Sequence, residues 1–177
     1  MRKEIVIAGL GGQGVQRLGR ILAKALHDKG FLVSFNSEYG PEARGGLSFS
    51  QVVVKESLED WPEILKVDIL AAMSQEGYNA WISKITPESK VLFDDSLVKS
   101  VPLLDAHQYP IPASKTANEL GSQIVANMVM LGAVAAVTGL LSLEELSEVA
   151  KKSTRKFSEV NLEAVERGYK LGSLLEN

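Results

Sequence analysis

Hydrophobic and polar positions follow one another along the chain in a strand-and-helix order. Residues 5–8 form a short apolar run that ends at a glycine, as expected for a strand buried on both faces. In residues 15–26, apolar side chains recur every three or four positions, which predicts an amphipathic helix, and Gly30 marks its end. Residues 31–35 are predicted to form the second strand, so the chain begins with a βαβ unit.

The same order continues towards the last residue. The pattern predicts further strands at residues 47–54, 68–73, 91–94 and 107–111, and helices at residues 75–85, 118–138 and 161–175. Pro87 is expected in the turn after the helix at 75–85, and Pro110 favours an edge position for the last strand. Ser142 and Glu145 have the spacing of a capping box, which predicts a helix start at that point.

Alternating strands and helices favour an α/β fold, a Rossmann-like, doubly wound, mostly parallel sheet with C-terminal helices. No linker or shift in composition divides the chain, so residues 1–177 are expected to form a single domain. Residues 36–46, with three glycines and a proline, are expected to form an ordered loop and are a candidate site by position.

The apolar segment 124–141 has about the length at which a membrane span becomes possible. Its alanines, its two glycines and Asn127 favour a buried helix instead, and its small residues would let another backbone approach closely. Asn127 is expected to have a hydrogen-bond partner and is a candidate for a subunit contact. The start of the chain lacks the features of a secretory signal, so we expect a cytoplasmic protein without a membrane segment.

Composition excludes several kinds of function. Nineteen basic and 22 acidic residues give a net charge of −3, which argues against binding to a nucleic-acid backbone. The chain has no cysteine and only two distant histidines, so it can ligate no iron-sulfur cluster through cysteine, and no metal site is expected. Asp94 and Asp95 follow a predicted strand and are expected to cap the next turn rather than to bind a metal ion.

A glycine-rich loop joins the first strand to the first helix and satisfies the pattern G-x-G-x-x-G. Its candidate ligand-binding residues are Gly9, Gly11, Gly12, Gln13 and Gly14. Glycine lets the backbone approach a ligand, and free N–H groups at a helix start favour an anion such as phosphate. Close packing of strand, helix and a neighbouring subunit would demand the same glycines. An NAD site would also need an acidic residue at the end of the second strand, where Glu38 comes slightly late.

A second loop carries a more specific pattern. Its candidate ligand-binding residues are Tyr39, Gly40, Glu42, Arg44, Gly45 and Gly46. If the first two strands are neighbours, both loops leave the carboxyl edge of the sheet and face each other, where ligands of open α/β sheets bind. Arg44 can then pair with a carboxylate or phosphate. An internal ion pair between Glu42 and Arg44 that only makes the loop rigid remains the alternative.

Together the two loops resemble the gamma subunit of the 2-oxoacid:ferredoxin oxidoreductases. The similarity continues through residues 68–76, 111–113 and 127–133 and covers nearly the whole chain. Tyr39 and Ala43 are more similar to the 2-oxoglutarate branch, because the pyruvate branch more often has Phe-Gly and Arg-Arg in this loop. Pyruvate or branched-chain specificity, and an independent NAD- or FAD-binding oxidoreductase, remain the alternatives.

The resemblance implies a role in a complex. Such enzymes decarboxylate a 2-oxoacid oxidatively with thiamine diphosphate, transfer the acyl group to coenzyme A and pass electrons through [4Fe-4S] clusters to ferredoxin. The expected partners are the alpha and beta subunits and, where the complex has one, a delta subunit. No catalytic residue is assigned to this chain, and we expect the isolated chain to be inactive. Its expected contribution is to lend the two loops to the assembly, near coenzyme A.

Overall fold

The computed structural model describes residues 2–40, 45–99, 101–102, 105–153 and 159–175. Within these ranges the strands are β1 (Lys3–Leu10), β2 (Leu32–Tyr39), β3 (Leu47–Lys55), β4 (Val67–Ala72), β5 (Ile85–Asp94) and β6 (His107–Ile111). The helices are α1 (Val15–Asp28), α2 (Gln75–Trp81), α3 (Ala113–Glu119), α4 (Ala126–Thr138), α5 (Leu143–Lys152) and α6 (Glu159–Leu174). Two 3₁₀ turns, η1 (Ile82–Lys84) and η2 (Gln123–Val125), follow α2 and precede α4.

One six-stranded sheet forms the centre of the fold, in the order β2-β3-β1-β4-β5-β6. The strands β1, β4, β5 and β6 pair in parallel, whereas β3 runs antiparallel between β2 and β1. The α/β prediction is confirmed, but β1 and β2 are not neighbours. Residues 40–46 between β2 and β3 are too few for a parallel crossover, which needs a dozen residues or more, so β3 folds back as a hairpin.

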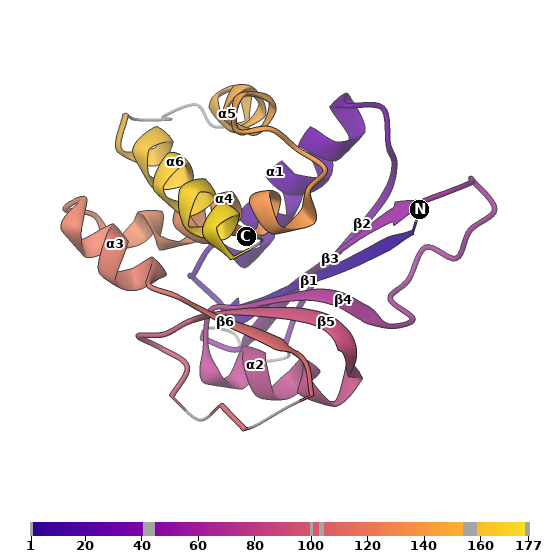
Figure 1. The fold of residues 1–177 in the computed structure, drawn as a ribbon, viewed down its shortest axis with the longest axis horizontal. Coiled ribbons are helices and arrows are strands. Elements are labelled where there is room, and N and C mark those ends of the chain that lie inside the picture. Colours follow the sequence, from indigo (N-terminus) through magenta and orange to yellow (C-terminus); the bar gives the residue numbers. More distant parts are fainter. Residues whose placement is uncertain (1, 41–44, 100, 103–104, 154–158, 176–177) are drawn as a thin grey trace.

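Helices α4 and α6 belong to the larger of the two helical layers on the sheet, and they pack against each other through glycines. In Figure 1, α2 lies on one face and the remaining helices lie on the other. Every residue of α4 is buried, and α6 packs along it. A Cβ atom on Gly132 would overlap the carbonyl oxygen of Val165, and one on Gly168 would overlap that of Val129. The small residues of α4 therefore admit another backbone, as predicted, and that backbone is α6 of the same chain.

Two predicted boundaries are wrong, each for a local reason. The helix expected at residues 118–138 is broken, because Gly121 adopts a left-handed conformation with φ of 75° and ends α3. Pro87 lies inside β5 rather than in a turn. It falls in a bulge, since Val67 pairs with Ile85 and Ile69 already pairs with Lys90, so its missing N–H costs no pairing between strands.

Other element boundaries in the structure differ less from the predicted ones. Strand β2 extends to Tyr39, so residues 36–39 belong to the sheet and the loop begins at residue 40. The helix predicted at residues 75–85 ends at Trp81 and continues as the 3₁₀ turn. The capping box is confirmed: Glu145 N–H donates to Ser142 Oγ over 3.2 Å, and Ser142 N–H donates to Glu145 Oε2 over 2.7 Å. Among the described residues, no helix combines the length and the apolar character needed to cross a membrane.

Candidate functional site

The glycine loop presents an open backbone at the start of α1. Gly12 is exposed with φ of 97°, and a Cβ atom there would meet nothing within 4 Å. Gly14 occupies the N-cap position of α1 with φ of 77° and has no side chain to cap the helix, and the first turn of α1 contains no acidic residue. The positive end of the helix dipole is therefore not neutralised by a carboxylate in that turn.

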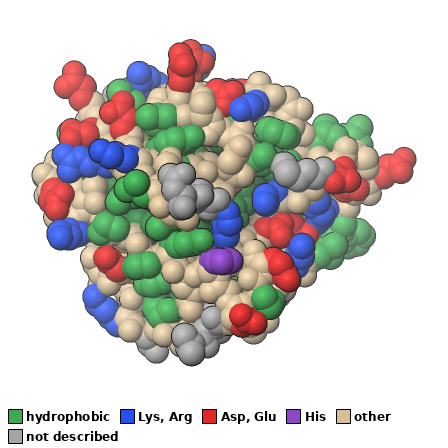
Figure 2. All heavy atoms as spheres, viewed as in Figure 1, with side chains coloured by type: hydrophobic (Ala, Val, Ile, Leu, Met, Phe, Trp, Pro, Cys, Tyr) green, Lys and Arg blue, Asp and Glu red, His purple; other side chains and the backbone are tan. Residues whose placement is uncertain are grey.

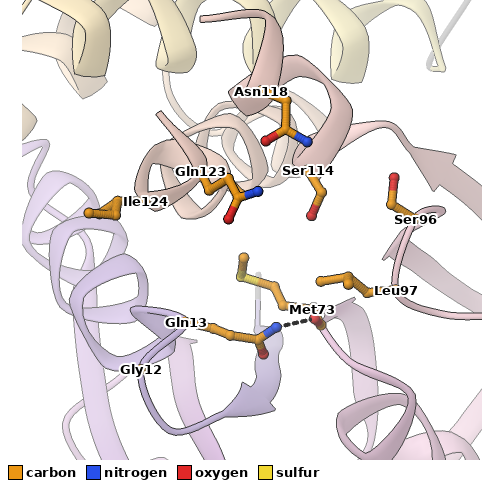
Figure 3. A pocket seen from close by; sticks show the side chains of 10 residues that line it. Gly12, Gln13, Met73, Ser96, Leu97, Ser114, Asn118, Gln123 and Ile124 are labelled. Carbon is orange, nitrogen blue, oxygen red and sulfur yellow. Dashed lines mark hydrogen bonds between the residues drawn. The ribbon is translucent and has the colours of Figure 1, made fainter. Parts of the chain in front are cut away.

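The side-chain amide of Gln13 forms hydrogen bonds within the protein. Leu10 N–H donates to Gln13 Oε1 over 2.7 Å, and Gln13 Nε2 donates to the carbonyl oxygen of Met73 over 2.7 Å. The second of these bonds is drawn in Figure 3. The amide thus connects the carboxyl ends of β1 and β4, two adjacent parallel strands. These two hydrogen bonds of the Gln13 amide fix the shape of the glycine loop.

Two further glycines of the motif are required by packing. A Cβ atom on buried Gly9 would lie 2.6 Å from Gln13 Oε1 and 2.9 Å from Val15 Cγ2. One on Gly14 would overlap Nδ2 of Asn127, which is 4% exposed in the first turn of α4. Oδ1 of Asn127 has no hydrogen-bond partner among the described residues, so the partner expected for this side chain is not found at its oxygen.

The second loop meets the first through the backbone. Gly11 N–H donates to the carbonyl oxygen of Gly46 over 2.8 Å, and Gly40 N–H donates to that of Leu47 over 2.6 Å. Tyr39 is 70% exposed, and Gly45 has φ of 73°. The two loops therefore lie side by side as predicted, although β3 rather than a direct β1–β2 pairing brings them together.

Residues 41–44 are outside the described residues. The roles predicted for Glu42 and Arg44, as ligand-binding groups or as an internal ion pair, therefore remain predictions. The described ends of this loop, Gly40 and Gly45, are held close to β3 and to the glycine loop.

A pocket of about 470 Å³ opens beside the glycine loop, where β1, β4 and β5 end (Figure 3). Its walls come from the glycine loop, the residue after β4, the turn after β5, helix α3 and the segment that leads from α3 into α4. The lining residues are Gly12, Gln13, Met73, Ser96, Leu97, Ser114, Asn118, Gln123, Ile124 and Ala126. In open α/β sheets, this edge is where ligands bind.

The pocket is uncharged, and its lining combines apolar side chains with a few polar ones. None of the ten lining residues that the structure describes carries an ionisable side chain, and Ser114, Asn118 and Gln123 supply hydroxyl and amide groups. Beneath the pocket, the fully buried Asp94 accepts hydrogen bonds from Ser96 N–H over 3.0 Å and from Ser114 Oγ over 2.6 Å. The predicted capping role of Asp94 is confirmed. The arrangement suits hydrogen bonding and apolar contact, and the described lining residues include no acidic or basic side chain for acid–base catalysis.

The sequence prediction missed eight of the ten described lining residues, all except Gly12 and Gln13. Ser96 follows β5 directly, so the rule that ligands bind at the carboxyl ends of strands would have pointed to it. Asn118, Gln123 and Ile124 had no such signal, because they reach the pocket only through the break at Gly121. Ile124 is nevertheless 80% exposed at the margin of the pocket, which is unusual for a large aliphatic side chain.

The geometry does not favour a separate NAD site. Glu38, the acidic residue nearest the end of β2, is separated from the glycine loop by the intervening strand β3. It lines a smaller hollow of about 330 Å³ with Phe49, Trp81 and Lys84, beside helix α2. The pocket next to Gly12 lies elsewhere and shares no lining residue with this hollow.

The clearest pKa shifts occur away from the pocket. Burial raises the pKa of Tyr78, whose hydroxyl donates to Gln108 Oε1 over 2.7 Å in the core on the α2 side. Hydrogen bonds from Lys29 and from Ser142 N–H lower the pKa of Glu145 on the surface. The described residues hold no group of three His, Asp or Glu side chains placed to bind a metal ion.

Fold and sequence together assign the chain to a family. The family described as pyruvate ferredoxin/flavodoxin oxidoreductase matches residues 4–171, and the chain belongs to it. The chain is 41% identical over 181 residues to the 2-oxoglutarate synthase subunit KorC of Methanocaldococcus jannaschii, covering 99% of this chain and 96% of that protein. The resemblance inferred from the two loops is thereby confirmed.

Two solved structures share the fold, each with a TM-score of 0.87. One is the gamma subunit of a keto/oxoacid ferredoxin oxidoreductase from Geobacter sulfurreducens, 30% identical, with 99% of this chain and 98% of that chain covered. The other is the 2-oxoglutarate:ferredoxin oxidoreductase of Magnetococcus marinus with 2-oxoglutarate, coenzyme A and succinyl-CoA bound, 29% identical. It matches 98% of this chain but only 31% of the Magnetococcus chain, so there the fold is part of a longer polypeptide.

Proposed function

We propose that this chain is the gamma-type subunit of a 2-oxoglutarate:ferredoxin oxidoreductase, which converts 2-oxoglutarate and coenzyme A to succinyl-CoA and carbon dioxide while reducing ferredoxin. The similarity to a 2-oxoglutarate synthase subunit over nearly the full length of both chains carries this proposal. The partners are the alpha and beta subunits and, where present, a delta subunit. The [4Fe-4S] clusters belong to those partners, because this chain has no cysteine to ligate a cluster, and we assign thiamine diphosphate to the alpha and beta subunits.

For the chain itself we propose a contribution to coenzyme A binding at the joined loops and the pocket. The uncapped start of α1 and the open backbone at Gly12 suit a phosphate group. The neutral amides of Asn118 and Gln123 suit the amide and adenine groups of coenzyme A, which need hydrogen-bond partners but no counter-charge. That the Magnetococcus enzyme was solved with coenzyme A bound adds support.

The reaction is tested on the assembled complex. The chain is co-expressed with the other subunits of its complex, and coenzyme A-dependent reduction of ferredoxin is measured with 2-oxoglutarate, pyruvate and 2-oxoisovalerate. We expect the highest kcat/KM with 2-oxoglutarate. A preference for pyruvate or 2-oxoisovalerate would reject the proposed specificity, and full activity of the other subunits without this chain would reject the role of a required subunit.

The pocket is tested by removing its amides. Asn118→Ala and Gln123→Ala each remove an exposed hydrogen-bonding side chain, and we expect each to raise the KM for coenzyme A about fivefold. Lys115→Ala is the matched control, because Lys115 is an exposed residue of α3 that does not line the pocket. Equal KM values for the control and both pocket variants would contradict coenzyme A binding at this pocket.

A further inference from the structure

The connection between β3 and β4, residues 56–66, lies at the end of the sheet opposite the glycine loops. It follows the carboxyl end of the antiparallel strand β3 and precedes β4, so it extends beyond the amino ends of the parallel strands (Figure 1). It displays three large apolar side chains within eight residues: Leu58 is 79% exposed, Trp61 58% and Leu65 67%. Such a density of exposed apolar side chains is a mark of an interaction site.

Polar contacts hold this docking loop in one conformation. The Arg2 guanidinium donates to the carbonyl oxygens of Trp61 and Glu63 over 2.7 and 2.8 Å, and to Glu4 Oε1 over 2.7 Å. The Glu4 side chain, only 1% exposed, also accepts the backbone N–H groups of Leu65 and Lys66. These bonds engage backbone atoms, so they fix the course of the loop while the apolar side chains remain in solvent.

A carboxylate also organises the first turn of the docking loop. Asp60 Oδ2 accepts Glu56 N–H over 2.6 Å and Ser57 N–H over 2.9 Å. A loop that is already ordered loses little conformational entropy when it binds, and an exposed tryptophan is the residue type most often found at the energetic centre of an interface. The anchored backbone and the solvent-facing Trp61 therefore fit a preformed docking element.

The charge of the docking loop restricts its partner. Residues 56–66 contain Glu56, Glu59, Asp60 and Glu63 against the single Lys66, so the loop carries a formal charge of −3, as large as that of the whole chain. Figure 2 shows acidic and hydrophobic side chains next to one another at the right, where Figure 1 places this connection. An apolar contact framed by carboxylates matches a pocket framed by Lys and Arg.

We propose that the docking loop inserts Trp61 into an apolar pocket, rimmed by basic residues, on a larger subunit of the oxidoreductase. The identity of the partner rests on the proposed function. A symmetric dimer formed through this loop does not fit, because it would bring two loops of charge −3 together. The proposal thus gives the molecule two binding regions: the loops and pocket at the carboxyl edge of the sheet, and the docking loop at the opposite edge.

The apolar part of the proposal is tested with Trp61→Ala. Since Arg2 bonds the backbone oxygen of Trp61, this change leaves the anchors in place, and the isolated chain should unfold at an unchanged temperature. Binding to the remaining subunits, measured by interferometry on the reconstituted complex, should weaken at least 30-fold. Leu174→Ala is the control, because Leu174 is an apolar residue of α6 that is 64% exposed, and it should bind as the wild type does.

The charged part is tested with the double substitution Glu59→Lys and Glu63→Lys. We expect the association rate at low salt to fall at least tenfold, with a smaller difference from wild type at high salt. The docking proposal would be overturned if Trp61→Ala and Leu174→Ala bound the other subunits equally well. It would also be overturned if the wild-type chain formed a dimer that Trp61→Ala dissociates. If the wild-type chain binds none of the other subunits, the proposed function itself fails, which separates the two outcomes.

Discussion

Two glycines of the first loop provide a controlled test of why the motif needs glycine. Gly12 and Gly14 both have positive φ, 97° and 77°, so an alanine at either position is strained. They differ in their surroundings: a Cβ atom on Gly12 meets nothing within 4 Å, whereas one on Gly14 overlaps the buried amide of Asn127. Comparing Gly12→Ala with Gly14→Ala therefore separates backbone strain from packing.

The expected magnitudes follow from this difference. Left-handed backbone costs an alanine about 1–2 kcal/mol, which is the whole effect expected for Gly12→Ala. Gly14→Ala adds an overpacking cost of about 1–3 kcal/mol, because Asn127 is 4% exposed and has little space in which to move. Asn127→Ala alone should be close to neutral, since it removes an amide whose Oδ1 is unpaired and improves helix propensity by about 0.7 kcal/mol or less.

The assay is urea unfolding of the four variants, including the double substitution of Gly14 and Asn127 by alanine. We expect the double variant to be more stable than the sum of the single effects predicts, by at least about 1 kcal/mol, because the overlap disappears. Additivity within about 0.5 kcal/mol would refute the reasoning. It would mean that Asn127 does not restrict Gly14 and that the third glycine of the motif is not required by packing.

Three further outcomes are expected. Gly168→Ala should destabilise the chain by about 1–3 kcal/mol in the same assay, because its Cβ overlaps the carbonyl oxygen of Val129, while Glu166→Ala on the exposed side of α6 should change stability by less than about 0.5 kcal/mol. Asp94→Ala should cost at least about 2 kcal/mol, since it leaves the N–H and hydroxyl of Ser114 unpaired; a smaller loss would contradict the capping role. Hydrogen bonds from Ser57 and Glu56 lower the pKa of Asp60. The Asp60 carboxylate therefore stabilises the docking loop above pH 3.8, and this stabilisation is lost as the pH falls through the lower pKa of the folded state. Hydrogen exchange of the loop should show this pH dependence, and the Asp60→Asn variant should lack it.

Local patterns were sufficient to predict most elements of the fold. The apolar run before Gly9, the three- and four-residue spacing in α1 and the capping box at Ser142 each depend on a few neighbouring residues, and each was correct. The long-range pairing was less accessible. The position of β3 between β2 and β1 depends on how the hairpin docks, whereas the antiparallel pairing of β2 with β3 follows from the short 40–46 connection seen in the structure.

The site was predicted only where local sequence determines it. Both loops were found, since glycine patterns after strands are visible in sequence, and they do lie side by side. The far wall of the pocket was missed because it requires two events that sequence periodicity does not report. Gly121 must end α3, and the chain must then turn so that Gln123 and Ile124 face the glycine loop.

The motif itself contains two groups of residues with different tasks. Gly9, Gln13 and Gly14 are accounted for by contacts within the protein, which would be needed whether or not a ligand binds. Gly11 contributes its N–H to the second loop, and Gly12 alone combines an exposed backbone, open space and a place in the pocket lining. A G-x-G-x-x-G pattern therefore predicts the turn between strand and helix more directly than it predicts a bound ligand. Within the glycine loop, the hypothesis of anion binding depends on Gly12 and the start of α1, and variants at these positions of the complex should alter the use of coenzyme A.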